Sequence, residues 1–161
     1  MFKSPASNAI VGAQGSGDFI HELRFSGYDG IIFKGKASAP VYVTIFDDKV
    51  EIKDASKMWG KEIPEVHQMV NDLYGNQTSQ YYIGPAGENL VKYAAVLTEW
   101  YRAAGRGGAG AVMGSKNLKA IVCKGTGAAP AVADQAKLNT LMESARVNLP
   151  IVRFSTREYG T

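Results

Sequence analysis

The sequence predicts an α+β domain in which hairpin-linked strands outnumber helices. Short runs of β-branched and aromatic residues follow one another across tight turns, which is typical of antiparallel strands. Helical periodicity is confined to a few segments with recognisable caps. The chain has 161 residues, of which 45% are hydrophobic and 20% charged, so it can bury one core of ordinary size and is not a disordered chain.

The first half of the chain contains one predicted helix and several strands. Asp18 is a typical N-cap for a helix over residues 19–25, and Gly27 is placed to end it. The alternating residues 49–53 predict a strand with one buried face, reached through a turn at Asp47 and Asp48. The other strands predicted here are the end of a strand at residues 2–5, a buried strand over residues 30–35 and a strand over residues 41–46.

The second half begins with a helix. Pro64 suits the first turn of a helix that runs to about Tyr74, and apolar residues recur along it at helical spacing. Asp134 is placed to cap a last helix over about residues 135–147. The remaining predictions are strands over residues 79–83, 91–97 and 118–124, a turn over 84–87 and a helix over 108–116. The two ends of the chain lack a clear start and finish, which is typical of a piece of a longer protein.

Glycines gather at two places in the chain. One group is Gly12, Gly15 and Gly17, and the other is Gly105, Gly107, Gly108, Gly110 and Gly114. Glycine is used where the backbone bends unusually or approaches another group closely. The two groups therefore predict that backbone atoms, rather than side chains, face a ligand.

The second glycine group precedes a predicted helix and lies between two arginines. Free backbone N–H groups at a helix start favour an anion, above all phosphate. Arg102 and Arg106 could pair with phosphate oxygens through two N–H groups each. The alternative is a helix entry softened by glycine, with both arginines in solvent.

Residues 105–110 also match the dinucleotide pattern G-x-G-x-x-G. That fingerprint requires a strand directly before it and an acidic residue about 20 positions later. Lys124 lies at about that distance, and Asp134 is the first acidic residue after the glycines. Nucleotide binding stays open as a weaker alternative.

Composition excludes several classes of protein. The net charge is +3 and the basic residues are scattered, which gives no case for nucleic acid. No apolar run approaches the ~18 residues of a membrane span, and the N-terminus lacks the layout of a signal peptide. The single cysteine, Cys123, excludes a disulfide framework and an all-cysteine metal site in this chain, and it lies in a predicted core strand. We expect a cytoplasmic protein.

Long stretches of the chain closely resemble the N-terminal domain of the aldehyde ferredoxin oxidoreductases, tungsten enzymes with a bis-pterin cofactor. The resemblance lies in residues 22–32, 51–61, 83–92 and above all 102–121, and Lys3-Ser4-Pro5 also matches. It covers roughly residues 2–127, with a weaker continuation to the end. It implies a partial N-terminal domain over residues 1–127, and a linker and the start of a helical domain over residues 128–161. The fold that it implies is two β-sheets related by a pseudo-two-fold, with peripheral helices.

The resemblance also implies where the cofactor lies. Two segments would hold the pterin phosphates, and the backbone carbonyls of Gln14 and Ala103 would bind a bridging Mg²⁺. The family has asparagine where this chain has Gln14, a change that a backbone ligand tolerates. The residues expected at the cofactor are Gln14, Gly15, Ser16, Gly17, Arg102, Ala103, Ala104, Gly105, Arg106, Gly107 and Gly108.

The function implied is the oxidation of an aldehyde to a carboxylic acid, with ferredoxin as the electron acceptor. The metal would be tungsten or molybdenum. A 4Fe–4S cluster and the catalytic side chains would belong to the remaining domains of the parent enzyme, because this chain has no cluster ligands and we assign it no catalytic residue. The complete protein could be a homo-oligomer. The alternative is a stand-alone, non-catalytic pterin-binding or assembly module, or an inactive remnant.

Overall fold

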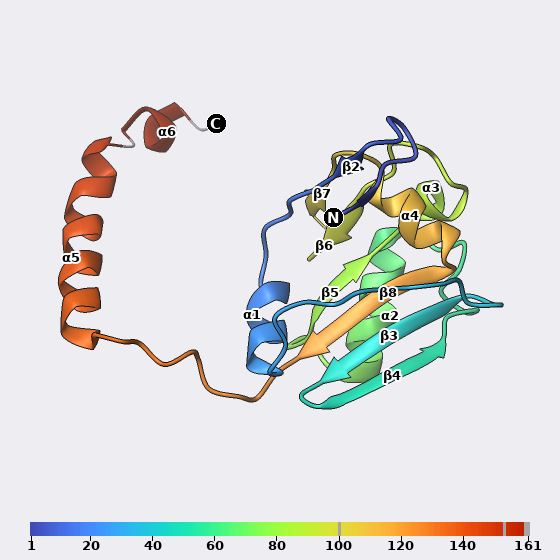
Figure 1. The fold of residues 1–161 in the computed structure, drawn as a ribbon, viewed down its shortest axis with the longest axis horizontal. Helices are drawn as coiled ribbons and strands as arrows, with labels where there is room; N and C mark the ends of the chain where they lie inside the picture. Colours follow the sequence, from blue (N-terminus) through green and yellow to red (C-terminus); the bar gives the residue numbers. More distant parts are fainter. Residues whose placement is uncertain (100, 153, 160–161) are drawn as a thin grey trace. The chain divides into compact units, whose positions relative to one another are not determined.

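The computed structural model describes residues 1–99, 101–152 and 154–159. Within them the chain divides into two compact units, residues 1–128 and 129–161 (Figure 1). The elements are β1 (Phe2–Lys3), β2 (Ile10–Val11), α1 (Phe19–Phe25), β3 (Val41–Phe46), β4 (Lys49–Asp54), α2 (Ile63–Tyr74), β5 (Ser79–Tyr82), α3 (Pro85–Glu88), β6 (Val96–Thr98), β7 (Arg102–Ala104), α4 (Ala109–Ser115), β8 (Leu118–Lys124), α5 (Gln135–Val152) and α6 (Phe154–Tyr159).

The described strands form two sheets, so the predicted α+β class with two sheets is confirmed. β1 and β2 pair as a small antiparallel hairpin. The other six strands form one sheet in the order β4-β3-β8-β5-β6-β7. β3 and β8 run parallel, whereas every other neighbouring pair is antiparallel. The parallel pair joins strands that are far apart in the sequence, in the interior of the sheet. β4 and β7 form the two edges.

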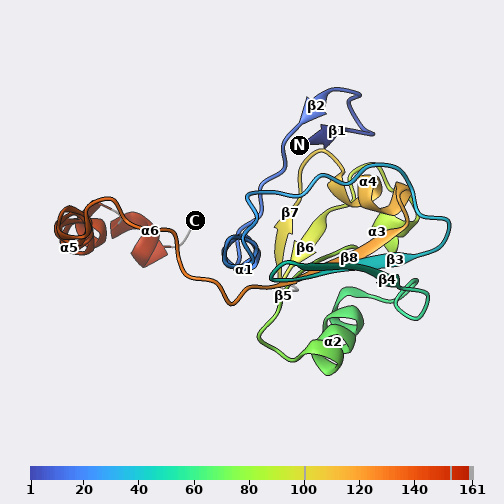
Figure 2. The same cartoon turned by 60° about the horizontal axis from the view of Figure 1, so that its bottom comes forward.

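Each face of the large sheet has its own apolar core. On one face, Val66 and Val70 of α2 pack against Tyr42, Tyr82 and Val122. The opposite face is covered by α1 and α4 (Figure 2), where apolar residues from α1 and the strands are buried together. This second cluster consists of Phe19, Leu23, Val43, Ile45, Leu118, Ile121 and Cys123. β8 contributes to both cores, which explains why nearly all of its residues are buried.

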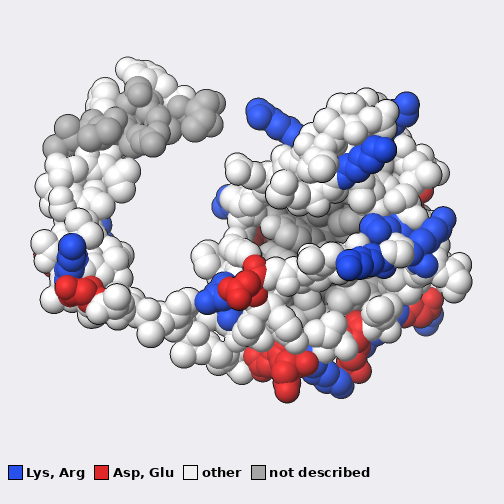
Figure 3. All heavy atoms as spheres, in the orientation of Figure 1, with Lys and Arg blue, Asp and Glu red and all other residues white. Residues whose placement is uncertain are grey.

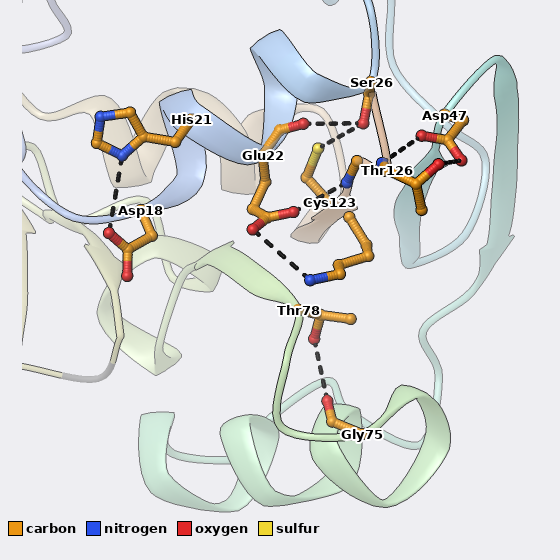
Figure 4. Close-up of polar contacts among 11 residues, drawn as sticks. Asp18, His21, Glu22, Ser26, Asp47, Gly75, Thr78, Cys123 and Thr126 are labelled. Atoms are coloured by element: carbon orange, nitrogen blue, oxygen red, sulfur yellow. Dashed lines mark hydrogen bonds and ion pairs between the residues drawn. The ribbon is translucent and has the colours of Figure 1, made fainter. Parts of the chain in front are cut away.

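The first helix is fixed to the end of β8 by polar contacts. Ser26 Oγ lies 3.6 Å from the Cys123 sulfur, and Glu22 accepts a hydrogen bond from the Gly125 N–H at 2.9 Å (Figure 4). Asp47, at the β3–β4 turn, accepts two hydrogen bonds from Thr126. Cys123 has no exposed surface and burial raises the pKa of its thiol, which confirms that it is a core residue.

A buried ion pair connects β8 to α3. The Lys119 ammonium contacts the Glu88 carboxylate, and the two side chains have exposed fractions of 0% and 5%. Lys119 also donates a hydrogen bond to the Lys61 carbonyl at 2.9 Å, and Glu88 accepts one from the Gly60 N–H at 2.8 Å. Burial lowers the pKa of Lys119, and the hydrogen bond with Glu88 opposes that shift. The pair ties α3 and the segment before α2 to the central strand.

Two strand predictions in the first half are wrong. Residues 30–35 form no strand and pair with none of the described strands, and Ile32 is 83% exposed. The predicted buried face of residues 49–53 is also uncovered, because Val50 and Ile52 of β4 are 51% and 72% exposed. In both cases the sequence pattern indicates apolar side chains suited to burial, but it does not provide an element that covers them.

Two predictions around α3 are also wrong in detail. Residues 84–87 were expected as a turn, but Pro85 begins the short helix α3. The strand expected over residues 91–97 starts only at Val96, because residues 91–94 form a turn in which the Ala94 N–H donates to the Val91 carbonyl. That turn accepts the Gly110 N–H at the Ala94 carbonyl, so it packs against α4 instead of continuing the sheet. The other predicted elements are confirmed, with end shifts of a few residues.

The unit of residues 129–161 contains two described helices, and its residues before Gln135 are not helical. Asp134 caps α5 as predicted, because its carboxylate accepts the Lys137 N–H at 2.9 Å. The helix extends to Val152, beyond the predicted end at about residue 147, and includes Pro150. A second short helix, α6, follows it.

Candidate functional site

The two glycine-rich segments meet at an open pocket of about 720 Å³ at the edge of the large sheet. One side comes from the segment between β2 and α1, through Gly12 and Gln14. The other comes from β7 and the residues after it, through Ala103, Gly105 and Arg106. The fold thus brings together residues that are far apart in the sequence, as the family resemblance implied. Gly12 also lines the pocket, although it was not among the expected cofactor contacts.

The pocket lies beside β7, which is an edge strand of the large sheet. β7 pairs with β6 on one side only, with Ala103 opposite Leu97. Along its other side runs the segment that contains Gly15, at which a Cβ atom would lie 3.3 Å from the Ala104 nitrogen. An edge strand leaves N–H and C=O groups without strand partners. Ala103, in the middle of β7, is the residue of this strand that lines the pocket.

Arg102 does not line the pocket. Its Nε lies 3.3 Å from the Glu99 carboxylate, and its guanidinium donates a hydrogen bond to Ser16 Oγ at 2.8 Å. Glu99 also accepts the Asp18 N–H at 2.5 Å. Sequence reasoning missed Glu99, because its partner Asp18 lies 81 positions away and no motif marks it. The predicted contacts of Arg102, Ser16 and Gly17 with a cofactor stay predictions.

The glycines at the start of α4 have a packing role in this structure. Gly108 has a φ of 81°, and a Cβ atom there would overlap the Lys92 carbonyl and approach Pro5. One N–H of the first turn of α4, that of Gly110, already donates to the Ala94 carbonyl at 2.8 Å. The free N–H groups predicted at this helix start are therefore partly engaged within the protein. Cofactor contacts at Gly107 and Gly108 stay predictions.

The chemistry of the lining suits phosphate and magnesium. The pocket is lined by glycines, the small residue Ala103, the amide side chain of Gln14 and one guanidinium, that of Arg106, with no carboxylate among its lining residues. In the view of Figure 3, Asp and Glu side chains of residues 1–128 gather mostly over the lower part, together with some Lys and Arg, whereas the upper part carries mainly Lys and Arg. Carbonyl oxygens are ligands that Mg²⁺ accepts, and the guanidinium and backbone N–H groups suit phosphate oxygens. The residues present therefore fit a phosphate-bearing group with a bridging Mg²⁺.

Other metal sites built from side chains are not found in the described residues. No group of three or more His, Cys, Asp and Glu side chains lies close enough there to hold a metal ion. The two histidines lie apart and have different contacts. His21 pairs with Asp18 at 3.7 Å at the surface, whereas His67 contacts Tyr82 and Asn71. No described helix is long and apolar enough to cross a membrane.

The glycine pattern of residues 105–110 does not lie in the unit that a dinucleotide fingerprint requires. β7, which precedes it, pairs antiparallel with β6. β8, which follows α4, is separated from β7 by β5 and β6 and is not a neighbour of β7. The fingerprint instead requires a helix that connects two parallel strands of a Rossmann sheet.

Fold and pocket together define an α+β domain with a glycine-rich pocket at the edge of its large sheet. Comparison with known proteins identifies the domain more closely. The family described as "Aldehyde ferredoxin oxidoreductase, N-terminal domain" matches residues 1–125. The chain belongs to this family, as the resemblance of residues 2–127 predicted.

Curated relatives match over nearly the whole chain. The chain is 46% identical over 164 residues to the tungsten-containing aldehyde ferredoxin oxidoreductase of Pyrococcus furiosus. It is 44% identical over 172 residues to the aliphatic sulfonate oxidoreductase, WOR-like subunit, of the same organism. Each alignment covers 99% of this chain and 27% of the relative. The chain thus spans about a quarter of the length of these relatives.

A solved structure with the same fold supports the assignment. The chain matches the active site complex BamBC of benzoyl coenzyme A reductase in complex with 1,5-dienoyl-CoA, with a TM-score of 0.86 and 38% sequence identity. The match covers 91% of this chain and 22% of that chain.

Proposed function

We propose that the chain is the pterin-holding portion of a tungsten oxidoreductase, and that the complete protein oxidises aldehydes to carboxylic acids. The observation that carries this proposal is the pocket at which Gln14 and Ala103 meet. Its backbone lining and its single guanidinium suit the phosphates of a pterin cofactor, with Mg²⁺ held by carbonyl oxygens.

The relatives support a role in holding a cofactor rather than in selecting a substrate. Their names refer to an aldehyde, an aliphatic sulfonate and benzoyl coenzyme A, yet all of them share this part of the chain. A domain common to proteins that act on such different compounds is best explained by a shared cofactor. Of these three names, that of the aldehyde enzyme refers to tungsten.

The division of labour within the proposed enzyme follows from the residues present. The metal and its pterin ligand would supply the two-electron redox chemistry. One aldehyde and one water would give one carboxylic acid, two protons and two electrons, and the electrons would leave through a 4Fe–4S cluster to ferredoxin. The described residues position the phosphates and offset their charge. Cluster ligands and catalytic side chains would come from the remaining domains.

The test uses the complete protein, expressed anaerobically with tungstate or with molybdate. We expect bound tungsten or molybdenum together with pterin in the purified protein, and aldehyde-dependent reduction of ferredoxin. A protein that contains neither metal would overturn the proposal. If the protein contained metal and pterin but oxidised no aldehyde, the cofactor role would stand and aldehydes would be rejected as the substrate class.

A further inference from the structure

Glu99 joins the two segments that form the pocket. It lies between β6 and β7, and its side chain is 23% exposed. One carboxylate oxygen accepts the Asp18 N–H at 2.5 Å, and the other lies 3.3 Å from Nε of Arg102. Arg102 in turn donates to Ser16 Oγ at 2.8 Å. These contacts form a ring that fixes residues 16–18 against β7.

Gly17 provides a second observation on the same contact. Its φ is 120°, a region that side-chain-bearing residues rarely adopt. A Cβ atom at Gly17 would lie 2.7 Å from the Glu99 carboxylate oxygen and 3.2 Å from a methyl group of Thr98. A residue with a side chain here would push the carboxylate away from Asp18. Glycine at this position is thus explained by the approach of Glu99, besides any approach of a ligand.

The position of this carboxylate is unexpected on electrostatic grounds. A negative charge close to a phosphate site opposes anion binding, and here it also offsets the charge of Arg102. Simple electrostatics would therefore place no carboxylate at Glu99. The contacts that it makes give a different reason for its presence, because each carboxylate oxygen is used to hold one of the two segments.

We propose that Glu99 is a positioning residue for the phosphate-binding pocket. It holds the segment of Gln14 to Gly17 at a fixed distance from β7, so that the backbone of Gln14 and that of Ala103 face one ligand. Arg102 acts in the same way, through its hydrogen bond to Ser16. In this role its guanidinium connects the two segments instead of binding a phosphate. This role rests on the proposed function, since it concerns the same pocket.

The positioning role and simple electrostatics predict opposite changes in anion affinity when the Glu99 carboxylate is removed. Removing the carboxylate should strengthen the binding of an anion if charge alone matters. It should weaken binding if the segment loses its place. Losing a residue that orients the groups in direct contact with a metal commonly costs about 10- to 100-fold in affinity. The sign of the effect therefore separates the two explanations.

The experiment compares Glu99→Ala and Glu99→Gln with Glu51→Ala in the cofactor-free protein. Glu51 is a matched control, because it pairs with Lys49 and Lys53 on β4, at the opposite edge of the sheet from β7. Calorimetry measures the affinity for magnesium pyrophosphate, which is the probe for the pterin phosphates. Amide hydrogen exchange measures the order of residues 14–18 and, as an internal reference, of β8.

We expect Glu99→Ala to bind magnesium pyrophosphate about 10- to 100-fold more weakly than the wild type. Exchange at residues 14–18 should rise while exchange in β8 stays unchanged, and Glu51→Ala should change neither. Glu99→Gln keeps an acceptor for the Asp18 N–H but loses the ion pair with Arg102. Its loss of affinity for magnesium pyrophosphate should therefore be smaller than that of Glu99→Ala. Should Glu99→Ala fail to fold, Glu99→Gln carries the test.

Unchanged or tighter binding by the Glu99 variants would overturn the positioning role alone, as would unchanged exchange at residues 14–18. A wild-type protein that does not bind magnesium pyrophosphate would instead overturn the phosphate pocket of the proposed function, and the role of Glu99 with it. The two failures are therefore distinguishable.

Discussion

At the scale of the residue, Arg106 is the charged group on which the pocket depends. It is the one charged side chain among the described residues that line the pocket. A charged hydrogen bond to phosphate contributes about 1.5–3 kcal/mol, which corresponds to roughly 10- to 100-fold in affinity. We expect Arg106→Ala to weaken the retention of pterin by that factor, as measured by the pterin content after extended dialysis.

Arg24→Ala is the control for this variant, since Arg24 pairs with Asp29 beside α1 and does not line the pocket. Arg106→Lys should fall between the wild type and Arg106→Ala, because lysine keeps the charge but cannot form two parallel hydrogen bonds. Equal pterin retention in Arg106→Ala and Arg24→Ala would remove the role given to Arg106.

Glu65 makes the start of α2 sensitive to acid. Its carboxylate accepts hydrogen bonds from the Lys61 ammonium at 2.8 Å and from the Glu62 N–H at 3.1 Å. These contacts, that with Lys61 first, hold the pKa of Glu65 below its ordinary value. Because the folded pKa is the lower one, the stabilising effect is complete above the unfolded value near 4.3 and is lost as the pH falls through the folded pKa.

Glu65→Gln tests this pH dependence. Glutamine keeps an oxygen that accepts the Glu62 N–H but cannot titrate. The variant should be slightly less stable than the wild type at pH 7, and its stability should fall less steeply between about pH 5 and pH 3. Urea unfolding across this range measures both quantities. Parallel pH curves for the two proteins would show that Glu65 has no such effect.

At the scale of the element, α4 is fixed by the close approach of backbone to backbone. Gly108 combines a φ of 81° with a position at which a Cβ atom would overlap the Lys92 carbonyl. We expect Gly108→Ala to lower the free energy of unfolding by at least about 2 kcal/mol, through strain and through displacement of the turn before β6.

Gly105→Ala is the matched control. Gly105 has no atom within 4 Å of an added Cβ, and it is not among the glycines with a positive φ. Its substitution should change the free energy of unfolding by less than about 1 kcal/mol. If chemical denaturation showed equal stability losses at Gly105 and Gly108, the packing role of Gly108 would be wrong.

The buried pair of Lys119 and Glu88 should matter more for stability than any surface ion pair. Removing one partner leaves an unpaired charge among buried groups and typically costs about 3–5 kcal/mol. Lys119→Met should show a loss of this size in urea unfolding, and Lys119→Met combined with Glu88→Gln should recover part of it. A fully stable Lys119→Met variant would contradict this view of the pair.

The elements that could be predicted from the sequence are those with local signals. The helix over residues 19–25 and the strand over residues 118–124 have local apolar patterns, and both match the structure, although Asp18 makes no side-chain capping hydrogen bond at the helix start. Residues 30–35 carry the pattern of a strand, but a strand also needs a neighbour, and sequence pattern cannot show whether one is present. The same limit applies to the exposed Val50 and Ile52 on β4.

The candidate site shows the same division. The glycine groups predicted backbone that faces a ligand, because glycine marks unusual backbone. In the structure, members of both groups line one pocket, but the ligand itself stays a prediction. The roles of single glycines and of Arg102 could not be predicted, since they depend on contacts between distant residues. Glu99 with Asp18, and Glu88 with Lys119, are separated by 81 and 31 positions, and nothing in the sequence connects them.

At the scale of the whole molecule, the chain is one part of a larger assembly of functions. The unit of residues 1–128 contains the pocket, and the described residues offer no side-chain metal site. Its relatives are about four times as long, since the chain covers 27% of them. In the function proposed above, this part would hold the cofactor, and substrate choice and electron transfer would belong to other parts of the complete protein.

The most direct test of this account is an experimental structure of the complete protein isolated with its cofactor. We predict that the pterin phosphates occupy the pocket between residues 12–15 and residues 103–106. Mg²⁺ should be bound by the carbonyls of Gln14 and Ala103, and Arg106 should contact a phosphate oxygen. A cofactor bound elsewhere, with this pocket filled by solvent alone, would contradict the account.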